Sequence, residues 1–133
     1  MKFNFDWNYI SAGAPYVTIS TTSLGFNMPS INLLGQPEEV MIGFDETNMT
    51  IGIKAYDGNP DVKTYLFKSR LKNGWVRIGC KEFSRYLSAI SNISFSPAKR
   101  YIARFDTEEK VLYVTVNKDS MEEEGGEENQ NEN

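Results

Sequence analysis

Short runs of alternating apolar and polar residues recur along this chain, and a period of two residues is typical of β-strands. Val17–Ser20 and Leu24–Phe26 predict two paired strands. Val40–Phe44 and Met49–Ile53 predict a hairpin, because a short loop of Asp, Glu, Thr and Asn joins the two apolar runs.

A short helix is predicted between the strand pair and the hairpin. Asn27 is a suitable N-cap, Pro29 fits the first helical turn, and Gly35 can end the helix in the left-handed conformation. A helix of about two turns is too short to be stable alone, so neighbouring strands must hold it. We expect its apolar face to consist of Ile31, Leu33 and Leu34.

The second half of the chain has a similar order of elements. After a turn or linker at 57–61, Val62–Leu71 is predicted to be extended, and Lys72–Gly74 to turn the chain into a strand at Trp75–Ile78. Cys80–Ile90 has apolar residues at spacings of three and four, which indicates an amphipathic helix.

The last predicted strands, Arg100–Phe105 and Lys110–Val116, form a second hairpin that aligns with the first. At an offset of 61 residues, matching positions include Phe44 and Phe105, Ile51 and Leu112, and Ile53 and Val114. We therefore expect an α+β, β-rich fold built from two strand-helix-hairpin units that form a pseudo-repeat.

This organisation divides the chain into four parts. Residues 1–16 form an N-terminal strand lead-in, 17–57 the first strand-helix-hairpin unit, and 58–118 the second, basic unit. Residues 119–133 form an acidic tail, which is predicted to be disordered because its Glu-rich composition cannot bury apolar surface. A length of 133 residues suits one domain or two small interlocked units.

The first unit resembles the AbrB/MazE/SpoVT family of swapped-hairpin transition-state regulators. Leu24-Gly25, Pro29, Leu34-Gly35 and the hairpin Val40–Ile53 follow the order of that family. The resemblance implies that two such units interlock into one swapped-hairpin-like barrel, within one chain or in a homo-oligomer, and that basic residues of the turn and helix contact DNA. Between Val17 and Glu39 there is no Lys or Arg, so such contacts would fall to the second unit.

The net charge of −4 conceals three unequal segments. Residues 1–57 contain two basic and six acidic residues, whereas 58–118 contain twelve basic and five acidic residues. Residues 119–133 contain seven acidic residues and no basic one. The net charges of the three segments are therefore −4, +7 and −7.

The residue types present exclude several kinds of chemistry. The chain has no His and a single Cys, Cys80, so the usual Cys/His zinc sites are absent and the commonest general base is missing. P-loop, GxGxxG and GxSxG motifs are also absent. We predict a protein that is not an enzyme and that needs no cofactor or metal. The enzymatic alternative is a Cys80 thiolate favoured by the helix dipole; a packing role is preferred.

The cysteine count and the hydropathy pattern bear on location. One cysteine cannot form an internal disulfide and fits a reducing compartment. The sequence has no apolar run long enough for a membrane helix, and MKFNFDWNYIS lacks the apolar core of a signal peptide. We therefore expect a cytoplasmic protein that does not interact with membranes.

The first functional hypothesis is DNA or RNA binding by the basic second half, because Lys and Arg release counterions from phosphates. Tyr65, Phe67 and Trp75 interleave with the basic residues and would supply stacking surfaces. The alternative is an ordinary solvated charged face. The predicted contact residues are Lys68, Arg70, Lys72, Arg77, Lys81 and Arg85.

The second hypothesis is a protein-interaction module. An inhibitor, an antitoxin-like protein or a bacterial or phage adaptor would fit a small, His-free and charge-polarised domain. The acidic tail lacks the apolar anchors that supply binding energy at an interface core, which counts against the antitoxin version specifically. The two hypotheses differ in salt dependence, since phosphate contacts weaken steeply as salt rises.

Overall fold

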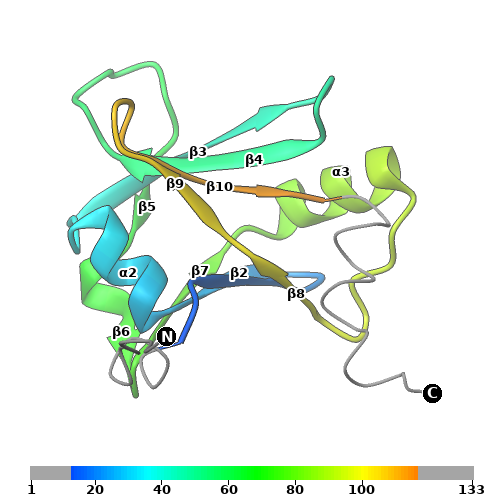
Figure 1. The fold of residues 1–133 in the computed structure, drawn as a ribbon. Coiled ribbons are helices and arrows are strands. Elements are labelled where there is room, and N and C mark those ends of the chain that lie inside the picture. Colours follow the sequence, from blue (N-terminus) through cyan, green and yellow to red (C-terminus); the bar gives the residue numbers. More distant parts are fainter. Residues whose placement is uncertain (1–12, 117–133) are drawn as a thin grey trace, which may run out of the picture.

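The computed structural model describes residues 13–116, which form two five-stranded antiparallel sheets flanked by two helices (Figure 1). The predicted α+β, β-rich class is confirmed. Within these residues the sheets do not close into the expected barrel. Most of the N-terminal lead-in, residues 1–12, and the tail from residue 119 onward lie outside the described residues, so the expectations for both stay predictions.

Sheet A has the strand order β6-β7-β2-β1-β8. Alternate residues of these strands, such as Val17, Leu24 and Val76, are fully buried, whereas Trp75 and Arg77 on the other face are exposed. This alternation gives sheet A one core face and one outer face. Its strands are β1 (Tyr16–Ile19), β2 (Ser23–Asn27), β6 (Leu71–Lys72), β7 (Trp75–Gly79) and β8 (Lys99–Ile102).

Sheet B has the strand order β5-β3-β4-β10-β9. The predicted first hairpin is confirmed, with Ile42 opposite Ile53 and Asp45 opposite Thr50. The second hairpin lies beside it, because β10 pairs with β4. The strands of sheet B are β3 (Glu39–Asp45), β4 (Thr50–Ala55), β5 (Tyr65–Leu66), β9 (Arg104–Asp106) and β10 (Val111–Thr115).

A single hydrophobic core joins the two sheets. Val17 and Phe26 enter it from sheet A, and Ile53 and Leu112 enter it from sheet B. Phe67 is fully buried and its ring meets that of Phe26 edge to face, with 5.3 Å between centroids. The two units are therefore parts of one folded body rather than separate domains.

Helix α2 (Met28–Leu34) begins and ends as the sequence predicts. Asn27 Oδ1 accepts a hydrogen bond from the Ser30 amide at 3.3 Å, and Gly35 has a φ of 82°. Ile31 is buried, but Leu33 is 40% exposed, so its assignment to the buried face is wrong. In a two-turn helix, Leu33 lies off the stripe set by Ile31 and Leu34.

Helix α3 (Lys81–Ser91) confirms the predicted amphipathic helix within one residue. Leu87 is fully buried, and Cys80, just before the helix, is buried in the core. The helix ends at Asn92, which adopts a left-handed φ of 60°. Neither α2 nor α3, nor any other helix within 13–116, has the length and apolar character needed to cross a membrane.

Two predicted strands differ from the structure. Val62–Leu71 is not one extended segment; it contains β5, the short 3-10 helix η1 (Lys68–Arg70) and the start of β6. Arg100–Phe105 is also divided, since β8 belongs to sheet A and β9 to sheet B. The break lies at Ala103, which is buried and whose amide donates to the Pro15 carbonyl at 2.9 Å. In Figure 1 this segment crosses from one sheet to the other.

Candidate nucleic-acid interface

A row of residues crosses the outer face of sheet A. Arg77 pairs with Gly25, Gly25 with Thr18, and Thr18 with Arg100. Neighbouring strands lie about 4.8 Å apart, so the two arginines stand roughly 14 Å apart at the ends of the row. The short residues Gly25 and Thr18 form a low floor between two cationic side chains.

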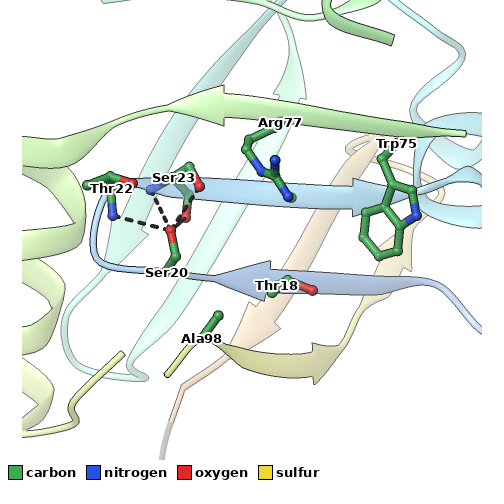
Figure 2. A pocket seen from close by; sticks show the side chains of 8 residues that line it. Thr18, Ser20, Thr22, Ser23, Trp75, Arg77 and Ala98 are labelled. Atoms are coloured by element: carbon green, nitrogen blue, oxygen red, sulfur yellow. Dashed lines mark hydrogen bonds between the residues drawn. The ribbon is translucent and has the colours of Figure 1, made fainter. Parts of the chain in front are cut away.

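Trp75 occupies the next position along β7 on the same face, opposite both Lys72 and Asn27. Its side chain is 40% exposed. Figure 2 shows the indole beside β2, close to Arg77 and across from Thr18. A Cβ at Gly25 would lie 3.8 Å from Trp75 Cε3, so the ring packs against bare backbone at this point.

Three adjoining hollows follow β7 and the start of α3. The first, of about 470 Å³, has Trp75 and Arg77 in its wall and Thr18 in its floor (Figure 2). The second, of about 780 Å³, is also lined by Arg70 and Lys72. No Asp or Glu lines the first or the second hollow.

The third hollow, of about 430 Å³, lies on α3 and contains Lys81 and Arg85. These residues are one helical turn apart and therefore share a face. Ser84 and Ser88 add hydroxyl groups, and again no acidic residue lines the space. Thr22 borders all three hollows, so they adjoin one another, and together they are called the basic track.

Local backbone geometry explains why Trp75 and Lys72 are neighbours. Asn73 and Gly74 have φ values of 55° and 81°, as in the tight turns that suit β-hairpins. The predicted hairpin turn is therefore confirmed, and it places Lys72 directly opposite Trp75. Both side chains consequently project from the outer face.

The turn between β1 and β2 fixes the middle of the track. Ser20 Oγ accepts hydrogen bonds from the amides of Thr22 at 3.2 Å and Ser23 at 3.0 Å. The Thr22 carbonyl in turn accepts a hydrogen bond from the Cys80 amide at 2.9 Å. These bonds tie the turn of the first half to the start of α3 in the second half.

The strands of the two sheets also differ in charge. The strands of sheet A contain four basic residues, Lys72, Arg77, Lys99 and Arg100, and no acidic residue. The strands of sheet B contain two basic residues and three acidic ones. The strand charges of sheet A would therefore suit an anionic ligand better than those of sheet B.

The structure brings five of the six sequence-predicted site residues to this track. Arg70, Lys72 and Arg77 line the second hollow, and Lys81 and Arg85 line the third. Lys68 lines none of the three hollows, although it is exposed and shares η1 with Arg70. Contact of these residues with nucleic acid stays a prediction.

The sequence interpretation did not include Arg100, Thr18 or Gly25 in the site. Thr18 and Arg100 project from the outer face because they alternate with buried residues such as Val17 and Tyr101, and Gly25 lies beside Thr18 in the strand register. Arg100 also stacks over the Tyr16 ring, with 4.5 Å between its guanidinium carbon and the ring centroid. The alternation could have placed each residue on a face, but not the strand order that makes them neighbours.

Two of the three aromatic residues proposed for stacking lie elsewhere. Phe67 is fully buried in the core and cannot meet a ligand. Tyr65 belongs to β5 of sheet B, and burial is the main cause that raises the pKa of its hydroxyl. Lys63 Nζ lies 5.3 Å from the centroid of the Tyr65 ring. Only Trp75 of the three borders the basic track.

Cys80 does not have the environment of a nucleophile. Its side chain is 5% exposed, and burial is the main cause that raises the pKa of the thiol above the usual value of 9.0. Hydrogen bonding from Ser84 opposes this shift without reversing it. The preferred packing role agrees with this burial, and residues 13–116 contain no group of three potential metal-ligating side chains.

Comparison with known proteins adds no further constraint: no family model, curated protein or solved structure matches this chain.

Proposed function

We propose that this chain is a small, non-enzymatic regulatory or accessory protein that binds nucleic acid through the outer face of sheet A. The observation that carries the proposal is a set of five basic residues lining three adjoining hollows, whose linings contain no Asp or Glu. Basic side chains at several points along a track can each replace a condensed counterion on a phosphate backbone.

The track combines both halves of the chain. The second half supplies the positive charges, and the first half supplies the hydroxyl groups of Thr18, Ser20 and Thr22 beside them. From Trp75 to Gly79 the strand spans about 13 Å, and α3 extends the track past Lys81. Several consecutive phosphates can therefore contact one face, which favours a chain-like anion over a small one.

Fluorescence anisotropy with labelled DNA tests the proposal in the full-length protein. The double variant K72Q/R77Q removes one Lys and one Arg from sheet A, and K54Q/R104Q removes one of each from sheet B. If two phosphate contacts are lost, affinity at low salt falls about tenfold in K72Q/R77Q and the salt slope falls by roughly 1.4 to 1.8. K54Q/R104Q should change affinity less than about twofold.

Comparison of the two double variants defines the results that would contradict the proposal. Equal weakening in both would show that net charge, and not the sheet A surface, governs binding. Absence of binding by the wild-type protein at low salt would overturn the proposal. Melting temperatures of both variants should stay close to wild type, because all four side chains lie largely at the surface.

The seven acidic residues of 119–133 oppose binding by long-range repulsion. A chain that ends at Lys118 changes the net charge from −4 to +3. We expect this chain to bind DNA more tightly at low salt than the full-length protein does. The difference should shrink as salt rises and the Debye length shortens.

A protein partner is the second candidate, and a specific surface favours it. Phe44, Phe83 and Tyr86 form an aromatic cluster between β3 and α3, with Tyr86 meeting Phe44 at 5.8 Å between centroids. Tyr86 is 45% exposed, and Tyr is enriched among residues that dominate protein interfaces. Capture of a partner that survives high salt and fails with Tyr86→Ala would favour an inhibitor, antitoxin-like or adaptor role.

Descent from a duplicated unit is supported by the register of sheet B. At the offset of 61 residues, Gly52 corresponds to Tyr113, and these two residues face each other in the β4–β10 pair. The same pair places Ile51 opposite Val114 and Ile53 opposite Leu112. Such a register is expected where two equivalent hairpins meet about a local two-fold axis, and it fits the proposed swapped-hairpin ancestry.

A further inference from the structure

We propose that the ligand of the sheet A face is a single nucleic-acid strand, with one unpaired base stacked on the indole of Trp75. This inference rests on the proposed nucleic-acid binding and specifies its substrate class. It identifies Trp75 as the residue that contacts the base, with Gly25 and Thr18 as the floor beneath the binding space.

The first step in the argument is the exposure of Trp75. An indole that served only the core would be covered, yet Trp75 is 40% exposed on a face whose neighbours are polar or cationic. One part of the ring rests near Gly25, which holds it across β2 instead of letting it project freely. A ring held in this way offers its face to a ligand at little cost in side-chain entropy.

The second step is the shape of the space beside the indole. The hollow of about 470 Å³ is concave because Gly25 and Ala98 contribute almost no side chain to its lining. Thr18 and Thr22 add hydroxyl groups to its lining, which can donate or accept hydrogen bonds at a base edge. A flat ring above a shallow floor with hydroxyl groups suits a base, and Arg77 in the same lining suits the adjacent phosphate.

The third step is the position of the charges. Arg77 and Lys72 flank Trp75 on β7 and β6, so phosphates on either side of a stacked base would meet a cation. Further along, Lys81 and Arg85 continue the track. Alternation of an aromatic platform with a cationic groove is the arrangement that binds single strands without strong sequence preference.

Duplex nucleic acid fits this geometry less well. In a duplex both faces of each internal base are covered by neighbouring base pairs, so the Trp75 face would meet only backbone or groove edges. The two arginines at the ends of the Arg77–Arg100 row would still attract phosphates. Dependence on Trp75 is therefore what separates single-strand stacking from general attraction to polyanions.

Anisotropy titrations with a labelled oligothymidine of about 12 nucleotides, the matching oligouridine and a duplex of equal length test the inference. Trp75→Leu keeps an apolar side chain but removes the aromatic ring, whereas Trp75→Phe keeps a ring. We expect Trp75→Leu to weaken single-strand binding about 10- to 100-fold, Trp75→Phe to retain most of it, and duplex binding to change little. Tyr86→Ala, an exposed aromatic residue on α3, is the matched control and should have no effect.

Tryptophan fluorescence gives an independent readout that does not require a binding-deficient variant. The chain has two tryptophans, so a Trp7→Phe background leaves Trp75 as the sole indole. Oligothymidine should quench this signal as it saturates the protein, and duplex should not. A single strand that binds without quenching Trp75 would overturn the inference.

The possible failures can be told apart. If no nucleic acid binds at low salt, both the inference and the proposed function are wrong. If duplex and single strand bind equally and Trp75→Leu changes neither, nucleic-acid binding stands and the single-strand inference is wrong. Trp75-dependent binding of either oligothymidine or oligouridine supports the inference, and comparison of the two identifies the preferred sugar.

Discussion

Trp75 and Gly25 fit together across neighbouring strands: a Cβ at position 25 would lie 3.8 Å from Trp75 Cε3 and 3.8 Å from the Thr18 Cβ. These are ordinary contact distances, so there is space for a methyl group but not for a longer side chain over the same floor. The size of residue 25 therefore controls both the position of the indole and the depth of the hollow beside it.

Substitutions at position 25 should affect the stability of the protein and its binding of nucleic acid to different extents. Gly25→Ala fits the available space and should change the free energy of unfolding by no more than about 1 kcal/mol, since it also reduces the freedom of the unfolded chain. Gly25→Leu should displace Trp75 and weaken oligothymidine binding at least about fivefold. Urea denaturation and anisotropy measure the two effects. Unchanged binding in Gly25→Leu would mean that the floor at Gly25 has no role in recognition.

Asn27 should be one of the most stabilising polar residues outside the core. Its Oδ1 accepts from the Tyr16 amide at 3.0 Å and the Ser30 amide at 3.3 Å, and its Nδ2 donates to the Ala14 carbonyl at 2.9 Å. Asn27→Ala removes all three bonds and should lower the free energy of unfolding by about 2 kcal/mol.

The control for Asn27 is a change to aspartate. Asn27→Asp keeps an acceptor for both amides but replaces the donor to Ala14 by a carboxylate oxygen, which the Ala14 carbonyl repels. If the two accepted bonds dominate, its cost in urea denaturation should be smaller than that of Asn27→Ala. Equal costs would indicate that the lost donor and this repulsion together outweigh the two accepted bonds.

Phe67 should matter for folding and not for ligand contact. It is fully buried against Phe26, so Phe67→Ala should lower the free energy of unfolding by about 3–5 kcal/mol through the cavity it leaves. Phe67→Leu should cost less because it fills part of that volume. If circular dichroism shows that the Phe67→Leu protein is folded, its affinity for DNA should match that of the wild type. A large loss of affinity there would restore Phe67 as a site residue.

The thiol of Cys80 should react slowly in the native protein. Burial raises its pKa above 9.0, so at pH 8 the thiolate fraction is lower than in the unfolded chain, and the core also blocks access. A chromogenic disulfide reagent should therefore modify native protein much more slowly than protein in urea. Fast native modification would contradict the buried packing role.

The raised pKa of the Cys80 thiol should also reduce the stability of the protein at high pH. Because the pKa is raised in the folded state, the contribution of the buried protonated thiol is complete below about pH 9 and is lost as pH rises through the folded value. Replacement of Cys80 by Ala should remove this part of the pH dependence. A denaturation series across alkaline pH with both proteins measures the difference.

Much of the local structure was predictable because it depends on short-range chemistry. The cap at Asn27, the stop at Gly35 and the turn at Asn73-Gly74 each follow from the conformational preferences of a few adjacent residues. The helix at 81–91 follows from a strong three- and four-residue apolar spacing. These elements would be recognisable in any fold that contained them.

The errors occurred where distant contacts override local pattern. Arg100–Phe105 alternates like one strand, yet Ala103 is buried at the passage between two sheets and its amide bonds to the Pro15 carbonyl. Phe67 is adjacent to Lys68 and near Arg70 in the sequence, like a surface aromatic, yet contact with Phe26 places it in the core. Neither partner could be identified from the sequence segment concerned.

The sequence by itself determined the α+β class, most strand and helix positions, and six candidate basic residues, of which five line the track, because charge and periodicity can be read directly from the sequence. The tertiary structure alone decided that β2 lies between β7 and β1, and so that Trp75, Arg77, Gly25 and Thr18 share one surface. Strand order depends on how two sheets bury a common core, which is a property of the whole chain and not of any one segment.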